Sequence, residues 1–258
     1  MNFAPLITAL ALPPEARVDQ RVPKKLLLEQ GAPTAADKRQ LQNGIEDMFW
    51  IAALKPSTIG VPLFRDEVRE YLEIAVLSVT LRAAAKAARL TELIHRAIPY
   101  PVVLLAGDGE TVSISLAHKR WSQGETGKVV IEELRRTAPL QPNAPTAEEA
   151  SFLASLALAG LPRRDVFALY QGWLDRVTAL EAAQVTGVFA PPDSDVRAAA
   201  LREGLDMYGS LKRDVAGLRG RAAKEKQINR RVELNLEIRR LEAKVADAVL
   251  GLTLGERS

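Results

Sequence analysis

The chain has 258 residues, of which 47% are hydrophobic and 26% are charged, and this composition excludes a disordered protein. It contains no cysteine, which excludes disulfides, thiolate metal sites and cysteine nucleophiles and fits a cytoplasmic protein. The formal net charge of +3 conceals a regional imbalance: residues 210–258 carry 12 Lys and Arg against 7 Asp and Glu, whereas residues 137–209 carry 5 against 9. The basic character is therefore expected at the C-terminal end.

The apolar stretch at the N-terminus predicts a short helix packed on the first domain. Residues 1–12 lack the basic segment of a secretory signal, and Pro13-Pro14 follows them. The longest other apolar stretch, residues 152–161, is far shorter than the roughly 20 residues that cross a bilayer. We therefore expect a protein without a membrane segment.

Residues 1–136 change repeatedly between helical and strand periodicity. Thr34 is a suitable N-cap with Asp37 behind it, and Gly107-Asp108-Gly109 is a hairpin signal between two apolar runs. In chain order we expect a helix over 35–46, strands over 48–54 and 71–81, a helix over 83–98, and strands over 102–106, 111–117 and 128–133. This order predicts a small α+β domain with a mixed sheet and helices against it.

A proline-rich stretch predicts the boundary of this domain. Residues 137–149 contain Pro139, Pro142 and Pro145 among small and polar residues. Proline removes backbone donors and biases the preceding residue away from helix, so we assign a linker there.

Only helical signals follow the linker. We expect a helical region over residues 150–209, including a helix that begins at Pro162 and a third that Ser194 caps. Residues 210–250 predict one long basic amphipathic helix, about 60 Å in length if continuous. Gly217 and Gly220 would be the place for a bend. The fold class is thus α+β, with a helical C-terminal half that ends in this helix.

The sequence shows no recognisable catalytic constellation, cofactor motif or metal-ligand cluster. His95 and His118 are the two histidines, and a lone histidine is usually structural or a surface hydrogen-bonding group. The enzymatic alternative is a divergent metal-dependent nuclease that uses Glu73, Asp108 or Glu110 with one of them. A restriction-type core needs a second acid and a lysine two residues apart, and this hairpin supplies no such lysine. Asp108 is better explained as a turn residue.

Basic side chains mark two candidate binding surfaces in the first domain. A stripe along the helix expected over 83–98 comprises Arg82, Lys86, Arg89 and Arg96. A second group at the end of a strand comprises His118, Lys119 and Arg120. A solvated helix face is the alternative for the stripe, because Glu92 partly neutralises it.

The C-terminal helix carries the densest basic signal, with 11 basic residues against 5 acidic ones over residues 210–244. Candidate nucleic-acid or partner-binding residues there are Arg219, Arg221, Lys224, Lys226, Arg230 and Arg231. The segment contains no aromatic residue, which favours contact with duplex phosphates or an acidic protein surface over base stacking. A merely solvated basic face is the alternative.

The same helix carries a coiled-coil seam of about two heptads. Its residues alternate at intervals of four and three and are Leu234, Ile238, Leu241 and Val245. This is shorter than an isolated coiled coil usually needs, so docking on another helix and homodimerisation both stay open.

Several motifs resemble an uncharacterised bacterial family, domain of unknown function 4391. The resemblance lies in Val22-Pro23-Lys24-Lys25, in Trp50 with residues 54–59, in residues 71–74, in Ile94-His95-Arg96-Ala97-Ile98-Pro99-Tyr100-Pro101, in Ala117-His118-Lys119-Arg120, and in a helical tail over 224–241. It covers most of the chain, and residues 94–101 are its most specific part. Lys24, Lys25, His95, Arg96 and Lys119 are of a type expected at an exposed partner surface.

The resemblance implies that family members accompany helicases and DNA methyltransferases in operons that resemble restriction or phage-defence systems. It implies no activity and no catalytic residue. We therefore expect a non-catalytic accessory subunit of a defence complex, which binds a helicase-type or methyltransferase partner and contacts DNA phosphates. The alternatives are the nuclease and a dimeric coiled-coil scaffold that binds no nucleic acid.

Overall fold

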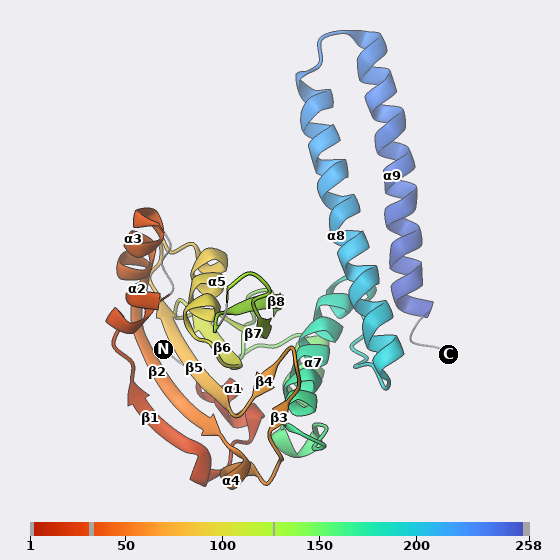
Figure 1. Ribbon diagram of the computed structural model, residues 1–258. Coiled ribbons are helices and arrows are strands. Elements are labelled where there is room, and N and C mark those ends of the chain that lie inside the picture. The colour runs from red at the N-terminus through yellow and green to blue at the C-terminus, as the bar shows by residue number, and fades with distance from the viewer. Residues whose placement is uncertain (1–2, 31–33, 126, 255–258) are drawn as a thin grey trace. The chain divides into compact units, whose positions relative to one another are not determined.

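Figure 1 shows the computed structural model of the protein, which describes residues 3–30, 34–125 and 127–254. The backbone contacts divide it into two compact units, Met1–Val177 (unit 1) and Thr178–Ser258 (unit 2). Unit 1 is α+β and unit 2 is helical, so the predicted fold class is confirmed.

Unit 1 is built on a six-stranded mixed sheet in the order β1-β2-β5-β6-β7-β8. The strands are β1 (Arg17–Arg21), β2 (Ile45–Leu54), β5 (Ile74–Leu81), β6 (Val102–Gly107), β7 (Val112–Trp121) and β8 (Val129–Arg136), and a separate two-stranded ribbon joins β3 (Phe64–Arg65) to β4 (Glu70–Tyr71). Among the strands of the described residues, β5 and β6 alone pair in parallel, and α5 (Ala87–Ala97) connects them. Both strands are buried on both faces, which explains their nearly continuous apolar sequences.

One face of this sheet is covered by α2 (Lys25–Gln30), α3 (Ala35–Gly44) and α5 (Figure 1). Leu27, Leu41, Leu90 and Ile94 pack there against β2, β5 and β6. Side chains of α7 (Val166–Thr186) contact β6 and β7, and the other helices of unit 1 are α1 (Ala4–Leu10), α4 (Pro56–Ile59) and α6 (Ala147–Ser155).

Many predicted elements are confirmed. Thr34 caps α3 by accepting from the Asp37 N–H at 3.1 Å, and β6 and β7 form the predicted antiparallel hairpin around Gly109. The short N-terminal helix and the strand over 128–133 are present as α1 and β8, and Ser194 caps a helix.

Other elements differ from the prediction. The strand expected over 71–81 is interrupted, because Tyr71 ends the β3–β4 ribbon and β5 begins at Ile74. The helix expected over 83–98 begins only at Ala87, so Arg82 and Lys86 precede it. Strand β1 was not predicted, because its mostly polar sequence shows no strand pattern. It pairs with β2 at the sheet edge, where Arg21 also forms an ion pair with Asp47.

The proline-rich stretch lies against the sheet of unit 1. Thr137 is buried, its N–H donates to the Ile114 carbonyl at 2.9 Å, and Leu140 forms a bridge with Val112. The division between the two compact units falls between Val177 and Thr178, inside α7.

Unit 2 is an antiparallel hairpin of α8 (Asp195–Lys224) and α9 (Ile228–Leu254), with the end of α7 against its open end (Figure 1). The prediction of one helix over 210–250 is therefore wrong, and residues 225–227 form the turn rather than the glycines. The predicted seam is used inside the chain, because Leu234, Ile238, Leu241 and Val245 pack against Val215, Leu218 and Ala222 of α8. Because the seam packs antiparallel on α8, the chain must reverse direction, and this explains why the predicted single helix is divided into two.

Candidate nucleic-acid and partner interface

The first group of predicted site residues forms a buried structural network in unit 1. Lys119 is only 4% exposed, and its Nζ donates to the Tyr100 carbonyl at 2.7 Å and to the Ile98 carbonyl. Both carbonyls belong to the turn that follows α5, where helix carbonyls lack partners. Burial lowers the pKa of Lys119 to about 7.

His95 joins α5 to the same strand. The ring is fully buried, and its Nε2 lies 3.0 Å from Ser115 Oγ. Burial, with a smaller contribution from Lys119, holds the pKa of His95 well below its usual value. Ser115 and Lys119 both lie on β7, where Ser115 contacts α5 and Lys119 contacts the turn after it. The expectation that His95 and Lys119 are exposed partner contacts is wrong, because they connect residues 94–101 to β7.

His118 faces α7 on the other side of β7. Its Nε2 lies 2.8 Å from Gln171 Oε1, and its Nδ1 lies 2.5 Å from the Tyr71 hydroxyl. An amide oxygen only accepts, so Nε2 carries the proton and Nδ1 accepts from Tyr71. Burial lowers the pKa of His118 to about 4, which keeps the ring neutral. His118 is thus a buried positioning group rather than an exposed binding residue.

Tyrosine 170 of α7 completes this contact between α7 and the sheet. Its hydroxyl accepts from the Ala117 N–H at 2.7 Å and donates to the Val102 carbonyl at 2.8 Å. The helical periodicity of the sequence predicts a buried face for α7, but the strand residues that bond to Tyr170 and Gln171 lie more than 50 residues away in the sequence.

The basic stripe expected around α5 is largely neutralised. Arg89 pairs with Asp37 through two hydrogen bonds of 2.9 and 3.0 Å and lowers the pKa of that carboxyl, and it also contacts Glu92 at 2.7 Å. Arg96 contacts Glu92 as well, at 2.6 Å. Arg82 and Lys86 lie exposed before the helix, so the four cations do not share one helix face.

The remaining predicted residues of unit 1 are separate from one another. Lys24 is half-buried and donates from Nζ to the Ile45 carbonyl, while Lys25 lies beside it at the start of α2. Arg120 donates to the Trp121 carbonyl at 3.2 Å.

Two of the three carboxylates of the nuclease alternative, Glu73 and Asp108, make other contacts. Glu73 contacts Lys55 at 3.6 Å, and Asp108 Oδ1 accepts from the N–H and hydroxyl of Thr111 in the hairpin turn. Among the described residues no three or more His, Asp or Glu side chains are grouped so that they could hold a metal ion.

The second group of predicted residues comes together at the closed end of the α8–α9 hairpin, over residues 219–231 (the hairpin tip). Exposed cations on both sides of the turn gather there: Arg219, Arg221, Lys224, Lys226, Arg230 and Arg231. Glu225 lies among them, and Arg219 contacts Glu242 at 2.6 Å. A hollow of about 550 Å³ beside the turn is lined by Arg221, Lys224 and Arg230 together with Glu225, Glu233, Leu234 and Glu237.

The helix dipoles distinguish the cations of the hairpin tip. Arg221 and Lys224 lie in the last turn of α8, where cations stabilise a helix. Arg230 and Arg231 lie near the N-terminus of α9, whose first turn contains no acidic residue. Cations at that positive end oppose the helix dipole by about 0.3–1 kcal/mol each. Helix stability therefore does not explain these two arginines.

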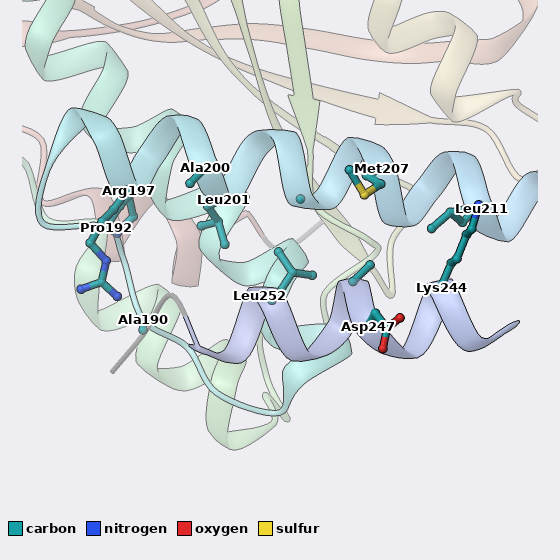
Figure 2. A pocket seen from close by; sticks show the side chains of 13 residues that line it. Ala190, Pro192, Arg197, Ala200, Leu201, Met207, Leu211, Lys244, Asp247 and Leu252 are labelled. Atoms are coloured by element: carbon teal, nitrogen blue, oxygen red, sulfur yellow. The ribbon is translucent and has the colours of Figure 1, made fainter. Parts of the chain in front are cut away.

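Unit 2 also contains a pocket of about 630 Å³ between the first half of α8 and the last turns of α9 (Figure 2). Its lining is mostly apolar: Ala190, Pro192, Ala200, Leu201, Gly204, Met207, Leu211, Ala248, Gly251 and Leu252, with Arg197, Lys244 and Asp247. Figure 2 shows Leu201 and Leu252 turned toward each other between the two helices. Arg197 contacts Asp193 at 3.4 Å.

Sequence reasoning missed a further exposed apolar row on α9. Ile228, Val232, Leu236 and Leu250 are between 52% and 68% exposed, although they lie on the helix that carries the buried seam. The available signal was a second 4-3 spacing, which runs through Val232, Leu236, Arg239, Ala243, Ala246 and Leu250.

Comparison with known proteins gives one match. A family model described as Domain of unknown function (DUF4391) matches residues 10–245. No curated protein and no solved structure matches the chain significantly. None of the described helices is both long enough and apolar enough to cross a membrane.

Proposed function

The chain belongs to the DUF4391 family, whose function is unknown, and we propose that it is a non-catalytic binding subunit that contacts the phosphates of duplex DNA through its hairpin tip. The observation that carries this proposal is the pair Arg230 and Arg231 at the positive end of α9. These arginines weaken their own helix, and a bound polyanion offsets that cost.

The composition of the hairpin tip supports a phosphate ligand. Its six cations are exposed and come from both helices and the turn between them, and Arg221, Lys224 and Arg230 line one hollow beside that turn. Residues 210–258 contain no aromatic side chain on which an unpaired base could stack, so backbone contact to a duplex is favoured over single strands.

The wider assembly is part of the proposal. The protein acts within an anti-phage defence or restriction-like complex and binds a helicase-type or methyltransferase protein. The support is the resemblance of the family to companions of such enzymes. Pull-down of the tagged protein from its native host, with the bound proteins identified by mass spectrometry, tests this part, and the recovery of neither a helicase nor a methyltransferase contradicts it.

Salt-dependent binding to duplex DNA tests the contact at the hairpin tip. A variant with Arg221→Gln, Lys224→Gln and Lys226→Gln is compared with the wild type by fluorescence anisotropy over a range of salt concentrations. Each lost phosphate contact reduces the slope of log affinity against log salt by about 0.9. We expect a slope smaller by about 2–3 and an affinity at least about tenfold lower at low salt.

A charge-matched control separates the tip from net charge. Lys38→Gln, Arg39→Gln and Lys55→Gln remove the same charge from exposed positions of unit 1. This variant is expected to bind DNA as the wild type does. Equal losses in both variants, or no duplex binding by the wild type at low salt, would contradict the proposed contact.

A further inference from the structure

Helix α9 carries two apolar stripes on opposite sides. The buried seam over 234–245 packs on α8. A second row (the outer stripe) consists of Val232, Leu236, Arg239, Ala243, Ala246 and Leu250. At 3.6 residues per turn the two stripes lie about 160° apart, so α8 cannot cover both.

The outer stripe has the spacing of a coiled-coil interface. Its members are separated by four, three, four, three and four residues, and all of them are exposed. It extends over about 27 Å of helix. Exposed apolar side chains aligned along one side of a helix indicate a protein-interaction surface, and the alternating intervals fit another helix.

The charges along the outer stripe disfavour a second copy of the chain. In the antiparallel register that covers all six positions, Arg240 faces Arg240, Glu242 faces Glu242 and Glu233 faces Asp247. In a parallel pair, Arg239 meets Arg239 in the core and Glu242 faces Asp247. Both arrangements place like charges together, which costs affinity.

Arg239 indicates what the partner provides. It interrupts the apolar row near its centre, is exposed, and has no ion pair among the side chains that the structure describes. Covering an unpaired cation is unfavourable, so a partner helix must bring a carboxylate to it. The small side chains of Ala243 and Ala246 leave room for large apolar residues from that helix.

We propose that the outer stripe of α9 docks an amphipathic helix of a different protein, with large apolar residues against Ala243 and Ala246 and an Asp or Glu against Arg239. This surface is separate from the cations of the hairpin tip and does not depend on the proposed DNA contact. It gives the hairpin a protein-binding side along α9 and a phosphate-binding end at the turn.

A charge-swap experiment tests the surface with defined probes. Two synthetic amphipathic peptides of about four heptads carry leucine where they face the alanines and differ only at the position facing Arg239, which is Glu or Lys. The full-length protein is expected to bind the Glu peptide about tenfold more tightly than the Lys peptide. Arg239→Glu is expected to reverse this preference.

Matched variants define the outcome. Arg213→Glu, an equal charge reversal on α8, should leave the preference for the Glu peptide unchanged. Leu236→Glu should abolish binding of both peptides, while duplex-DNA binding and far-UV dichroism stay unchanged. Failure to bind the Glu peptide, or binding that ignores Arg239→Glu, overturns the proposal. So does a concentration-dependent dimer in sedimentation that Leu236→Glu dissociates, because a second copy would then be the occupant.

Photo-crosslinking in the native host tests the natural partner. A crosslinking amino acid replaces Ala243, and the crosslinked segment is identified by mass spectrometry. We expect an amphipathic helix from a different protein, with an Asp or Glu within one turn of the crosslinked residue. A crosslink to a second copy of this chain, or to a segment without such a carboxylate, overturns the proposal.

Discussion

Lys119 combines deep burial with an ionisable group, and this makes the stability of unit 1 depend on pH. Its ammonium group has two backbone carbonyl partners but no carboxylate among the contacts described for it. Burial therefore disfavours the charged form, and the pKa falls from 10.5 to about 7. The stability that this depressed pKa confers is fully present above the unfolded pKa and is lost as the pH falls through about 7.

The variant Lys119→Met isolates this pH dependence. Between pH 7 and 10.5 the unfolded lysine binds a proton that the folded lysine does not, so stability rises with pH. We expect the wild-type free energy of unfolding, relative to that of Lys119→Met, to increase from pH 7 to about pH 9 by up to about 1.4 kcal/mol per pH unit. Urea unfolding at each pH measures it. Lys38→Met on exposed α3 should show no such trend, and a flat difference for Lys119→Met would contradict the buried neutral lysine.

The buried hydroxyl of Tyr170 is expected to contribute to the stability of unit 1. Tyr170→Phe keeps the ring but leaves the Ala117 N–H and the Val102 carbonyl without this partner. An unsatisfied buried group costs about 1–3 kcal/mol, so we expect a loss of that size in the free energy of unfolding of unit 1. Tyr208→Phe on α8, where the ring is half-exposed, should change little. Equal effects of the two changes would contradict the role of the Tyr170 hydroxyl.

At the scale of elements, the sequence predicts those helices and strands whose buried residues recur at a regular spacing. Strands β5 and β6 were predictable because strands buried on both faces are continuously apolar, and α7 because its buried residues recur at helical spacing. His95 could not be placed in this way. The periodicity of α5 identifies one apolar face, whereas Ser115, which accommodates the polar ring on another side, lies 20 residues later.

The hairpin turn shows the same limit. Residues 225–227 are Glu, Lys and Gln, which favour helix, while Gly217 and Gly220 lie within α8 without interrupting it. Packing of the seam on α8 therefore decides where the helix breaks. This turn brings the cations of the hairpin tip to one end of the hairpin. The six cations were identified from the sequence, but the turn between them was not predicted.

A matched pair of truncations on α9 distinguishes the two stripes. Ile238 is 8% exposed in the seam, and Leu236, two residues away, is 52% exposed on the outer stripe. Ile238→Ala should destabilise the hairpin by about 2 kcal/mol or more, because it removes buried contacts with α8. Leu236→Ala should change stability by less than about 0.5 kcal/mol. Hydrogen exchange of residues 215–222 measures the difference, and similar protection in both variants would contradict the assignment of the stripes.

The whole molecule combines units of different character. Unit 1 buries its histidines and the Lys119 ammonium, while unit 2 exposes its cations at the hairpin tip and an apolar row along α9. Within residues 178–211 acidic residues outnumber basic ones by 5 to 2, whereas residues 212–240 carry 10 basic against 4 acidic. Unit 2 therefore has a positive hairpin tip and a negative open end. A polyanion that approaches unit 2 is attracted to the tip rather than to the open end.

The separation into two units predicts independent unfolding, and the tryptophans allow it to be measured. All three, Trp50, Trp121 and Trp173, lie in unit 1, so their fluorescence reports that unit alone, while far-UV dichroism also reports the helices of unit 2. Ile238→Ala should shift the dichroism transition and leave the fluorescence transition in place, and Tyr170→Phe should shift the fluorescence transition. The double variant should show additive losses within about 0.5 kcal/mol, because the two sites share no partner. Because α7 runs through the unit boundary as one helix, coincident transitions in both variants would show instead that it couples the units into one cooperative fold.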